Sequence, residues 1–115
     1  MPDLKAELQT KTRTAILAYN MNRVQLVQTA LQEGGREAVS RLEDEFVALC
    51  NAEHELTRTE LNQNHPQYQS LMEDAVENGN LLQASILELQ NIDNILDVMA
   101  KTVALVGRVL LVLAA

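Results

Sequence analysis

Apolar side chains recur at steps of three and four residues along most of the chain, which is the spacing of helices with one buried face. In the first third these positions are Ala15, Ile16, Tyr19, Val24, Leu26, Val27, Ala30 and Leu31. Asp3 can cap the start of this helix, and the pattern predicts that it runs to about Glu33. Gly34-Gly35 follows, and glycine adopts the left-handed conformation that ends helices at little cost. We therefore expect an antiparallel return at this point.

A second helix is predicted from about Arg36 to Gln63. The row of residues that should face the first helix starts apolar and then turns acidic: Val39, Leu42, Phe46, Leu49, Glu53, Leu56 and Glu60. In an antiparallel hairpin, positions whose numbers sum to about 69 face each other, so Glu53 and Glu60 should pair with Lys11 and Arg13. Asn64-His65-Pro66 then predicts a second reversal, because proline suits the first turn of a helix.

From Tyr68 onward one heptad phase can be followed to the end of the chain. Its positions are Leu71, Ala75, Asn78, Leu82, Ser85, Leu89, Ile92, Leu96, Met99, Val103, Val106, Leu110 and Leu113. Asn78-Gly79-Asn80 has the composition of a turn and leaves open a break near Gly79, but Leu71, Ala75 and Leu82 stay on one face across it. A continuous third helix would be about 70 Å long, against about 45 Å for each of the first two.

Such a third helix would pass the Gly34-Gly35 turn near Ile95, so the most apolar stretch of the chain, Leu96 to Leu113, would project beyond the hairpin. Leaving it in water would expose more apolar surface than a monomer tolerates. We therefore predict an all-α fold, an antiparallel bundle of three long helices with coiled-coil-like packing that dimerisation completes. The predicted interaction residues are Leu96, Met99, Val103, Val106, Val109, Leu110 and Leu113.

Composition narrows the alternatives. The chain has 115 residues, which predicts a single helical-bundle domain over 1–115. Four Gly, two Pro and 3% aromatic residues are too few for the turns and strands of a β-fold. A net charge of −7 repels a phosphate backbone, so we expect no nucleic-acid partner. A single cysteine and a polar, helix-like N-terminus without a secretory signal favour a cytoplasmic location.

The candidate chemistry is limited to Cys50, Glu53 and His54, which share part of one helical face. They could present a soft metal pair or a thiol beside a base. One helix cannot aim all three at a single substrate, and neither His54 nor His65 has the Glu three residues earlier that dimetal bundles use. The sequence therefore favours a buried thiol, and we expect no catalytic residue, no metal ligand, no cofactor and no enzyme activity.

A membrane role is a second alternative, because Val98 to Ala115 contains no acidic residue. Arg108 interrupts this stretch, and the 14 residues after Lys101 fall short of the roughly 20 needed to cross a bilayer. Insertion of a cationic, apolar helix at a membrane surface remains open.

The leading functional hypothesis is a non-enzymatic interaction or scaffold protein that self-associates through its C-terminal helix as a homodimer or higher homo-oligomer. The same apolar surface could bind a protein partner. In outline the chain is similar to small bacterial secretion and export chaperones, which are acidic helical hairpins with an apolar docking face. That similarity lies in shape and composition and involves no motif. It implies a chaperone- or adaptor-like role, with a membrane-active helical hairpin and a metal-binding bundle as alternatives.

Overall fold

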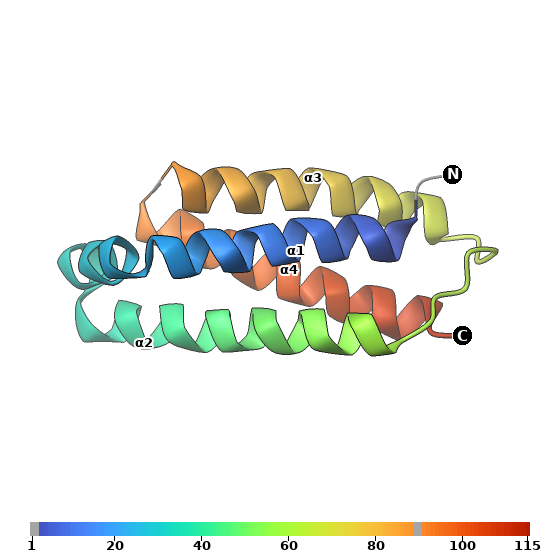
Figure 1. Ribbon diagram of the computed structural model, residues 1–115, viewed down its shortest axis with the longest axis horizontal. Coiled ribbons are helices and arrows are strands. Elements are labelled where there is room, and N and C mark those ends of the chain that lie inside the picture. The colour runs from blue at the N-terminus through green and yellow to red at the C-terminus, as the bar shows by residue number, and fades with distance from the viewer. Residues whose placement is uncertain (1–2, 89–90) are drawn as a thin grey trace.

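A computed structural model describes residues 3–88 and 91–115, and within them all regular structure is helical. The four helices are α1 (Leu4–Met21), α2 (Arg23–Arg58), α3 (Tyr68–Leu87) and α4 (Ile92–Leu113). They lie side by side in a bundle that measures 46 × 20 × 19 Å (Figure 1). The all-helical prediction is confirmed, but the bundle has four helices and the predicted number of three is wrong.

The helices alternate in direction along the chain. α1 packs against α2 and α3, and α4 also packs against α2 and α3, so α1 and α4 lie on one diagonal of the bundle. The backbone N–H of Leu4 donates to the Tyr68 hydroxyl at 2.7 Å, which ties the starts of α1 and α3 together at the same end. Residues 59–67 therefore cross that end to join α2 to its diagonal neighbour α3 (Figure 1).

The first predicted helix is broken. α1 ends at Met21, and Asn22, with φ −108° and ψ 13°, turns the chain before α2 begins. The first part of α2 is seen nearly end-on in Figure 1, so it runs across the end of the bundle. Leu26 and Ala30 from this part are fully buried in the core. Burial of these two residues against helices distant in sequence is the reason that one straight helix to Glu33 does not form.

The turn predicted at Gly34-Gly35 is confirmed. Gly35 has φ 69° and ψ −160°, a backbone conformation that costs little only for glycine, and it interrupts the helical geometry of α2. The remainder of α2 then runs back along the bundle to Arg58, five residues short of the predicted end at Gln63. The predicted cap of the first helix is also confirmed, because Asp3 Oδ1 accepts from the Lys5 N–H at 3.0 Å.

The third predicted helix is broken as well, although not at Gly79. α3 continues through Asn78-Gly79-Asn80 and ends at Leu87. Asn91 caps the start of α4 by accepting from the Asn94 N–H at 2.9 Å. The heptad position at Leu89 lies outside the described residues. The prediction of one helix of about 70 Å is therefore wrong, because α4 folds back between α2 and α3 instead of extending past them.

Two adjoining groups of buried side chains form the core. The group nearer the crossing part of α2 contains Tyr19 and Phe46, whose rings stack with centroids 4.0 Å apart. The group nearer the chain termini contains Leu4, Leu8, Leu56 and the last apolar residues of α4. The C-terminus is held there by two backbone hydrogen bonds, from Asn62 N–H to Leu113 C=O at 2.7 Å and from Ala115 N–H to Glu60 C=O at 2.9 Å. These two bonds hold the end of α4 against the segment that follows α2.

Candidate functional site

The predicted interaction residues lie mainly inside the bundle. Five of the seven are buried: Leu96, Met99, Val106, Val109 and Leu113. Val103 and Leu110 are half-buried and pack against the edge of the core. The overhang that led us to predict these residues as an interface does not form, because α2 and α3 of the same chain cover them. Self-association stays a prediction, but Leu96, Met99, Val109 and Leu113 have almost no surface with which to make it.

Three of the seven do line a surface groove between α2 and α4, which we name the α2–α4 groove. These are Val103, Val106 and Leu110. Gly107 completes its α4 side, and α2 contributes Ala48, Asn51, Ala52 and Glu55. The groove has a volume of about 320 Å³. It exists because Ala48, Ala52 and Gly107 are too small to fill the space between the two helices.

Large apolar side chains extend from the surface beside this groove. Leu111 is 85% exposed, and Val47 is also exposed on α2. Arg108 lies one helical turn before Leu111 and is exposed on the same outer side of α4. Leu111 is the most exposed large apolar side chain among the described residues.

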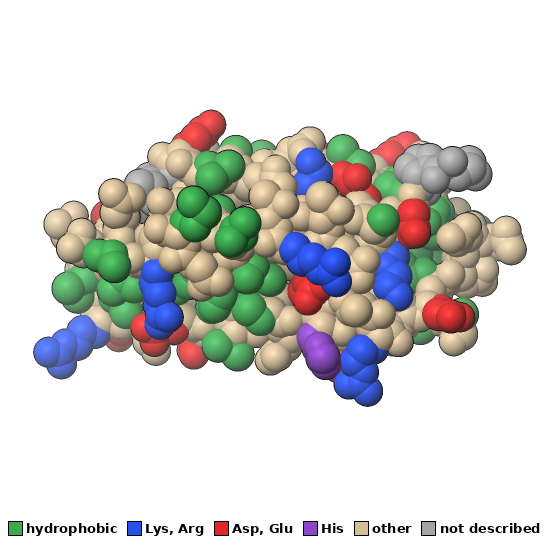
Figure 2. Space-filling model, in the orientation of Figure 1, with side chains coloured by type: hydrophobic (Ala, Val, Ile, Leu, Met, Phe, Trp, Pro, Cys, Tyr) green, Lys and Arg blue, Asp and Glu red, His purple; other side chains and the backbone are tan. Residues whose placement is uncertain are grey.

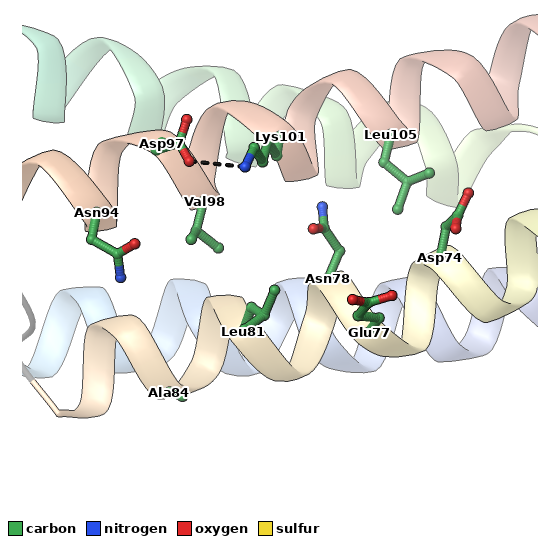
Figure 3. A pocket seen from close by; sticks show the side chains of 10 residues that line it. All are labelled: Asp74, Glu77, Asn78, Leu81, Ala84, Asn94, Asp97, Val98, Lys101 and Leu105. Atoms are coloured by element: carbon green, nitrogen blue, oxygen red, sulfur yellow. Dashed lines mark ion pairs between the residues drawn. The ribbon is translucent and has the colours of Figure 1, made fainter.

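A second groove separates α3 from α4 on the other side of α4, and we name it the α3–α4 groove. Its volume is about 450 Å³. Figure 3 shows Leu81, Val98 and Leu105 directed into the space between the two helices. Acidic side chains stand at its edges, and one of them, Asp97, is 3.0 Å from the ammonium of Lys101. The remaining lining residues are Asp74, Glu77, Asn78, Ala84 and Asn94.

Sequence reasoning missed this second groove because it depends on the break between α3 and α4. In a continuous helix, Leu81 and Val98 would lie about 25 Å apart along one axis. The one available signal was Asn91 with Asp93 two residues later, a polar cap followed by an acidic first turn that marks the start of a helix.

An exposed apolar corner also lies where α1 meets α2. Leu17, Met21 and Val24 recur at steps of four and three and are all more than half exposed. Figure 2 shows hydrophobic side chains gathered over the left half of this face, where α1 ends and α2 begins. None of these three residues lines the α2–α4 groove or the groove between α3 and α4.

The three residues considered for chemistry do not converge. Glu53 accepts from the Arg13 guanidinium at 2.6 Å, which confirms the predicted pairing between the first two helices. His54 is exposed, whereas Cys50 is half-buried. Burial is the main cause that raises the pKa of the Cys50 thiol, and the negative charge of Glu53 raises it further. A raised pKa lowers the fraction of reactive thiolate. Within the described part of the chain no three His, Cys, Asp or Glu side chains are grouped to hold a metal ion.

The two other residues of the predicted charge pairing lie elsewhere. Lys11 packs against α3, where the aliphatic part of its side chain lies against the backbone at Gly79. Glu60 follows the end of α2 and lines a small hollow with Asp3 and Lys5. Within the described residues Glu60 does not form the predicted pair with Lys11 or Arg13.

Two buried hydroxyl groups, those of Thr12 and Tyr19, have no hydrogen-bond partner among the described residues. Burial raises the pKa of the Tyr19 phenol, the positive charge of Arg23 lowers it by less, and Glu43 adds to the increase. A buried hydroxyl without a hydrogen-bond partner lowers the free energy of unfolding, so the hydroxyl of Tyr19 destabilises the folded state.

The fold and its surface define a four-helix bundle with two grooves that flank α4. Comparison with protein-family models, with curated proteins and with solved structures finds no match to this chain. Among the described residues, no helix is long and apolar enough to cross a membrane.

Proposed function

We propose that this chain is a non-enzymatic helical scaffold that self-associates through the face formed by the α2–α4 groove and Leu111. The exposure of Leu111, at 85%, beside a groove of small apolar residues is the observation that carries this proposal. The function predicted from the sequence is retained, but its surface moves from the buried side of α4 to the outer side.

The residues of this face suit helix-to-helix contact between two copies. Ala48, Ala52 and Gly107 let another helix approach closely, and a Cβ added at Gly107 would meet no atom within 4 Å. In a two-fold contact the same face is used twice, so Leu111 of each copy can enter the groove of the other. Glu55 in the groove, which is 3.6 Å from Arg58 in an exposed pair, and Arg108 beside the groove have opposite charges, which favours such a reciprocal arrangement.

The size of the face predicts a weak association. From Ala100 to Leu113 the outer side of α4 is about 20 Å long, and with α2 the face is about 20 Å wide, which gives roughly 400 Å². A standard stable interface buries about 800 Å² on each partner. We therefore expect a dissociation constant in the micromolar range or above.

Sedimentation velocity over a wide concentration range tests the proposal. The wild-type chain should shift from monomer to dimer as its concentration rises through the micromolar range, and Leu111→Glu should weaken the dimer by about 10-fold or more. Leu17→Glu is the matched control, because Leu17 is an exposed helical leucine on α1, diagonal to α4. A wild-type chain that stays monomeric, or a dimer lost with Leu17→Glu and kept with Leu111→Glu, refutes the proposed interface.

The alternative functions have less support. A membrane-active hairpin would need an apolar helical face free to insert, whereas most of the apolar side of α4 is buried in the bundle. A metal-binding bundle would need several ligands in one place, and His54 and Cys50 have no third partner among the described residues. An adaptor- or chaperone-like role remains compatible with the scaffold proposal, since α4 has a second groove on its other side.

A further inference from the structure

We infer that the α3–α4 groove is a separate binding site whose occupant is a basic amphipathic helix of a partner protein. This inference is independent of self-association, because the groove lies on the opposite side of α4 from the α2–α4 groove. It depends on the shape, the apolar surface and the charge of the groove.

The shape of the groove fits a short helix. Its lining runs from Asn94 to Leu105 on α4 and from Asp74 to Ala84 on α3. These stretches are about 17 and 15 Å long, which matches three turns, or about 11 residues, of a third helix. The space is open because Asn78, Ala84 and Asn94 are short side chains at the seam between α3 and α4. A helix lying in a groove between two others is a common mode of peptide recognition.

The bottom of the groove is apolar. Val98 and Leu105 are only 6% and 8% exposed, and their remaining surface forms part of the groove lining. Leu81 is 51% exposed and extends over the same space from α3 (Figure 3). Apolar side chains at every third or fourth position of an incoming helix would cover these three residues and remove Leu81 from water.

The edges of the groove select for positive charge. Asp74 and Glu77 stand on α3, and neither has an ion-pair partner within the described part of the chain. Asp97 stands on α4 with Lys101, so the lining carries three carboxylates and one ammonium. Residues 59–100, which include all of α3, contain seven Asp or Glu and no Lys or Arg. A helix with Lys or Arg beside its apolar stripe is therefore attracted, and an acidic helix, a nucleic acid or an anionic membrane is repelled.

A second copy of this chain does not supply such a helix. Two stretches of its sequence carry basic residues and no acidic ones: residues 8–32, with Lys11, Arg13 and Arg23, and residues 98–115, with Lys101 and Arg108. In the second stretch Lys101 is paired with Asp97, and most of the apolar side of α4 is buried in its own bundle. Arg13 is paired with Glu53 and Lys11 packs against Gly79, so both are engaged within their own bundle. The charge that complements the groove must come from a different protein.

Two synthetic peptides of about 14 residues test the inference, one with Leu at helical spacing and Lys elsewhere, the other with Glu in place of each Lys. Fluorescence anisotropy with the full chain should show binding of the Lys peptide alone. That binding should weaken about 10-fold between 20 and 150 mM salt, because the edge charges are exposed. Equal binding of the two peptides, or no binding of either, overturns the inference.

Matched variants separate the groove from the overall charge of the protein. Asp74→Lys with Glu77→Lys changes the net charge by +4, and so does Glu43→Lys with Asp44→Lys on the exposed side of α2. Only the first pair of substitutions should weaken binding of the Lys peptide, by about 10-fold or more. Ala84→Phe, which fills the groove without changing charge, should also weaken it. Equal losses from the two charge-reversed pairs, or full binding to Ala84→Phe, would place the peptide elsewhere and refute the site.

Discussion

The close approach of α1 and α3 at Gly79 leads to a quantitative prediction. A Cβ at residue 79 would lie 2.5 Å from Cγ and 2.8 Å from Cβ of Lys11. These atoms are near the backbone of α1 and cannot swing aside, so Gly79→Ala must push the two helices apart. We expect this overpacking to cost about 1 to 3 kcal/mol. The higher helix propensity of alanine returns about 1 kcal/mol, which leaves a net loss of roughly 0 to 2 kcal/mol.

Gly107→Ala is the matched control for this prediction. Gly107 is also within a helix, and a Cβ there would contact nothing within 4 Å. This substitution should gain about 1 kcal/mol from helix propensity alone. The two variants should therefore differ by about 1 to 3 kcal/mol in free energy of unfolding, although the chemical change is the same.

Urea unfolding followed by circular dichroism measures this difference directly. The protein concentration should be kept low enough that the proposed self-association does not contribute to stability. If Gly79→Ala stabilises the chain as much as Gly107→Ala does, the contact between Lys11 and α3 is not tight and the placement of α1 beside α3 is refuted.

Two further predictions concern the buried phenol and the start of α4. Tyr19→Phe removes a buried hydroxyl that lacks a partner among the described residues, so it should raise the free energy of unfolding by up to about 1 kcal/mol. Because folding raises the pKa of Tyr19, the wild-type chain should also lose stability as the pH rises above about 10, and Tyr19→Phe should lose less. Urea unfolding at several pH values measures this, and parallel pH profiles of the two proteins would contradict it. Asn91→Ala removes the cap of α4 and should lower the free energy of unfolding by about 1 kcal/mol, whereas Asn91→Ser should keep most of the wild-type stability because serine can also cap. Equal stability of Asn91→Ala and the wild-type chain would show that the cap is not needed.

Local patterns in the sequence were sufficient to predict several elements of the fold. The spacing of three and four predicted helices throughout, and Gly34-Gly35 predicted a turn that Gly35 makes with φ 69°. Asp3 was predicted as a cap, and Arg13 and Glu53 were predicted to lie together. Each of these features depends on residues close in sequence or on the simple register of a hairpin, so the sequence alone contains the needed information.

The two helix breaks were decided by tertiary structure. The apolar spacing continues through Asn22 and through residues 88–91, because Ser85, Ile92 and Leu96, all buried, would share one stripe in a straight helix as well. What differs is the burial partner. Folding α4 back places it against α2 and α3, and the apolar surface buried in this way belongs to residues far apart in the chain.

The candidate sites follow from the same cause. Both grooves are built from two helices, and neither exists until α4 turns back beside α3 and α2. The sequence by itself determined that α4 is the most apolar helix and must be covered. Only the tertiary structure decided that its own chain covers most of it, and that Leu111 and the acidic edges of the α3–α4 groove remain at the surface, because burial depends on which helices become neighbours.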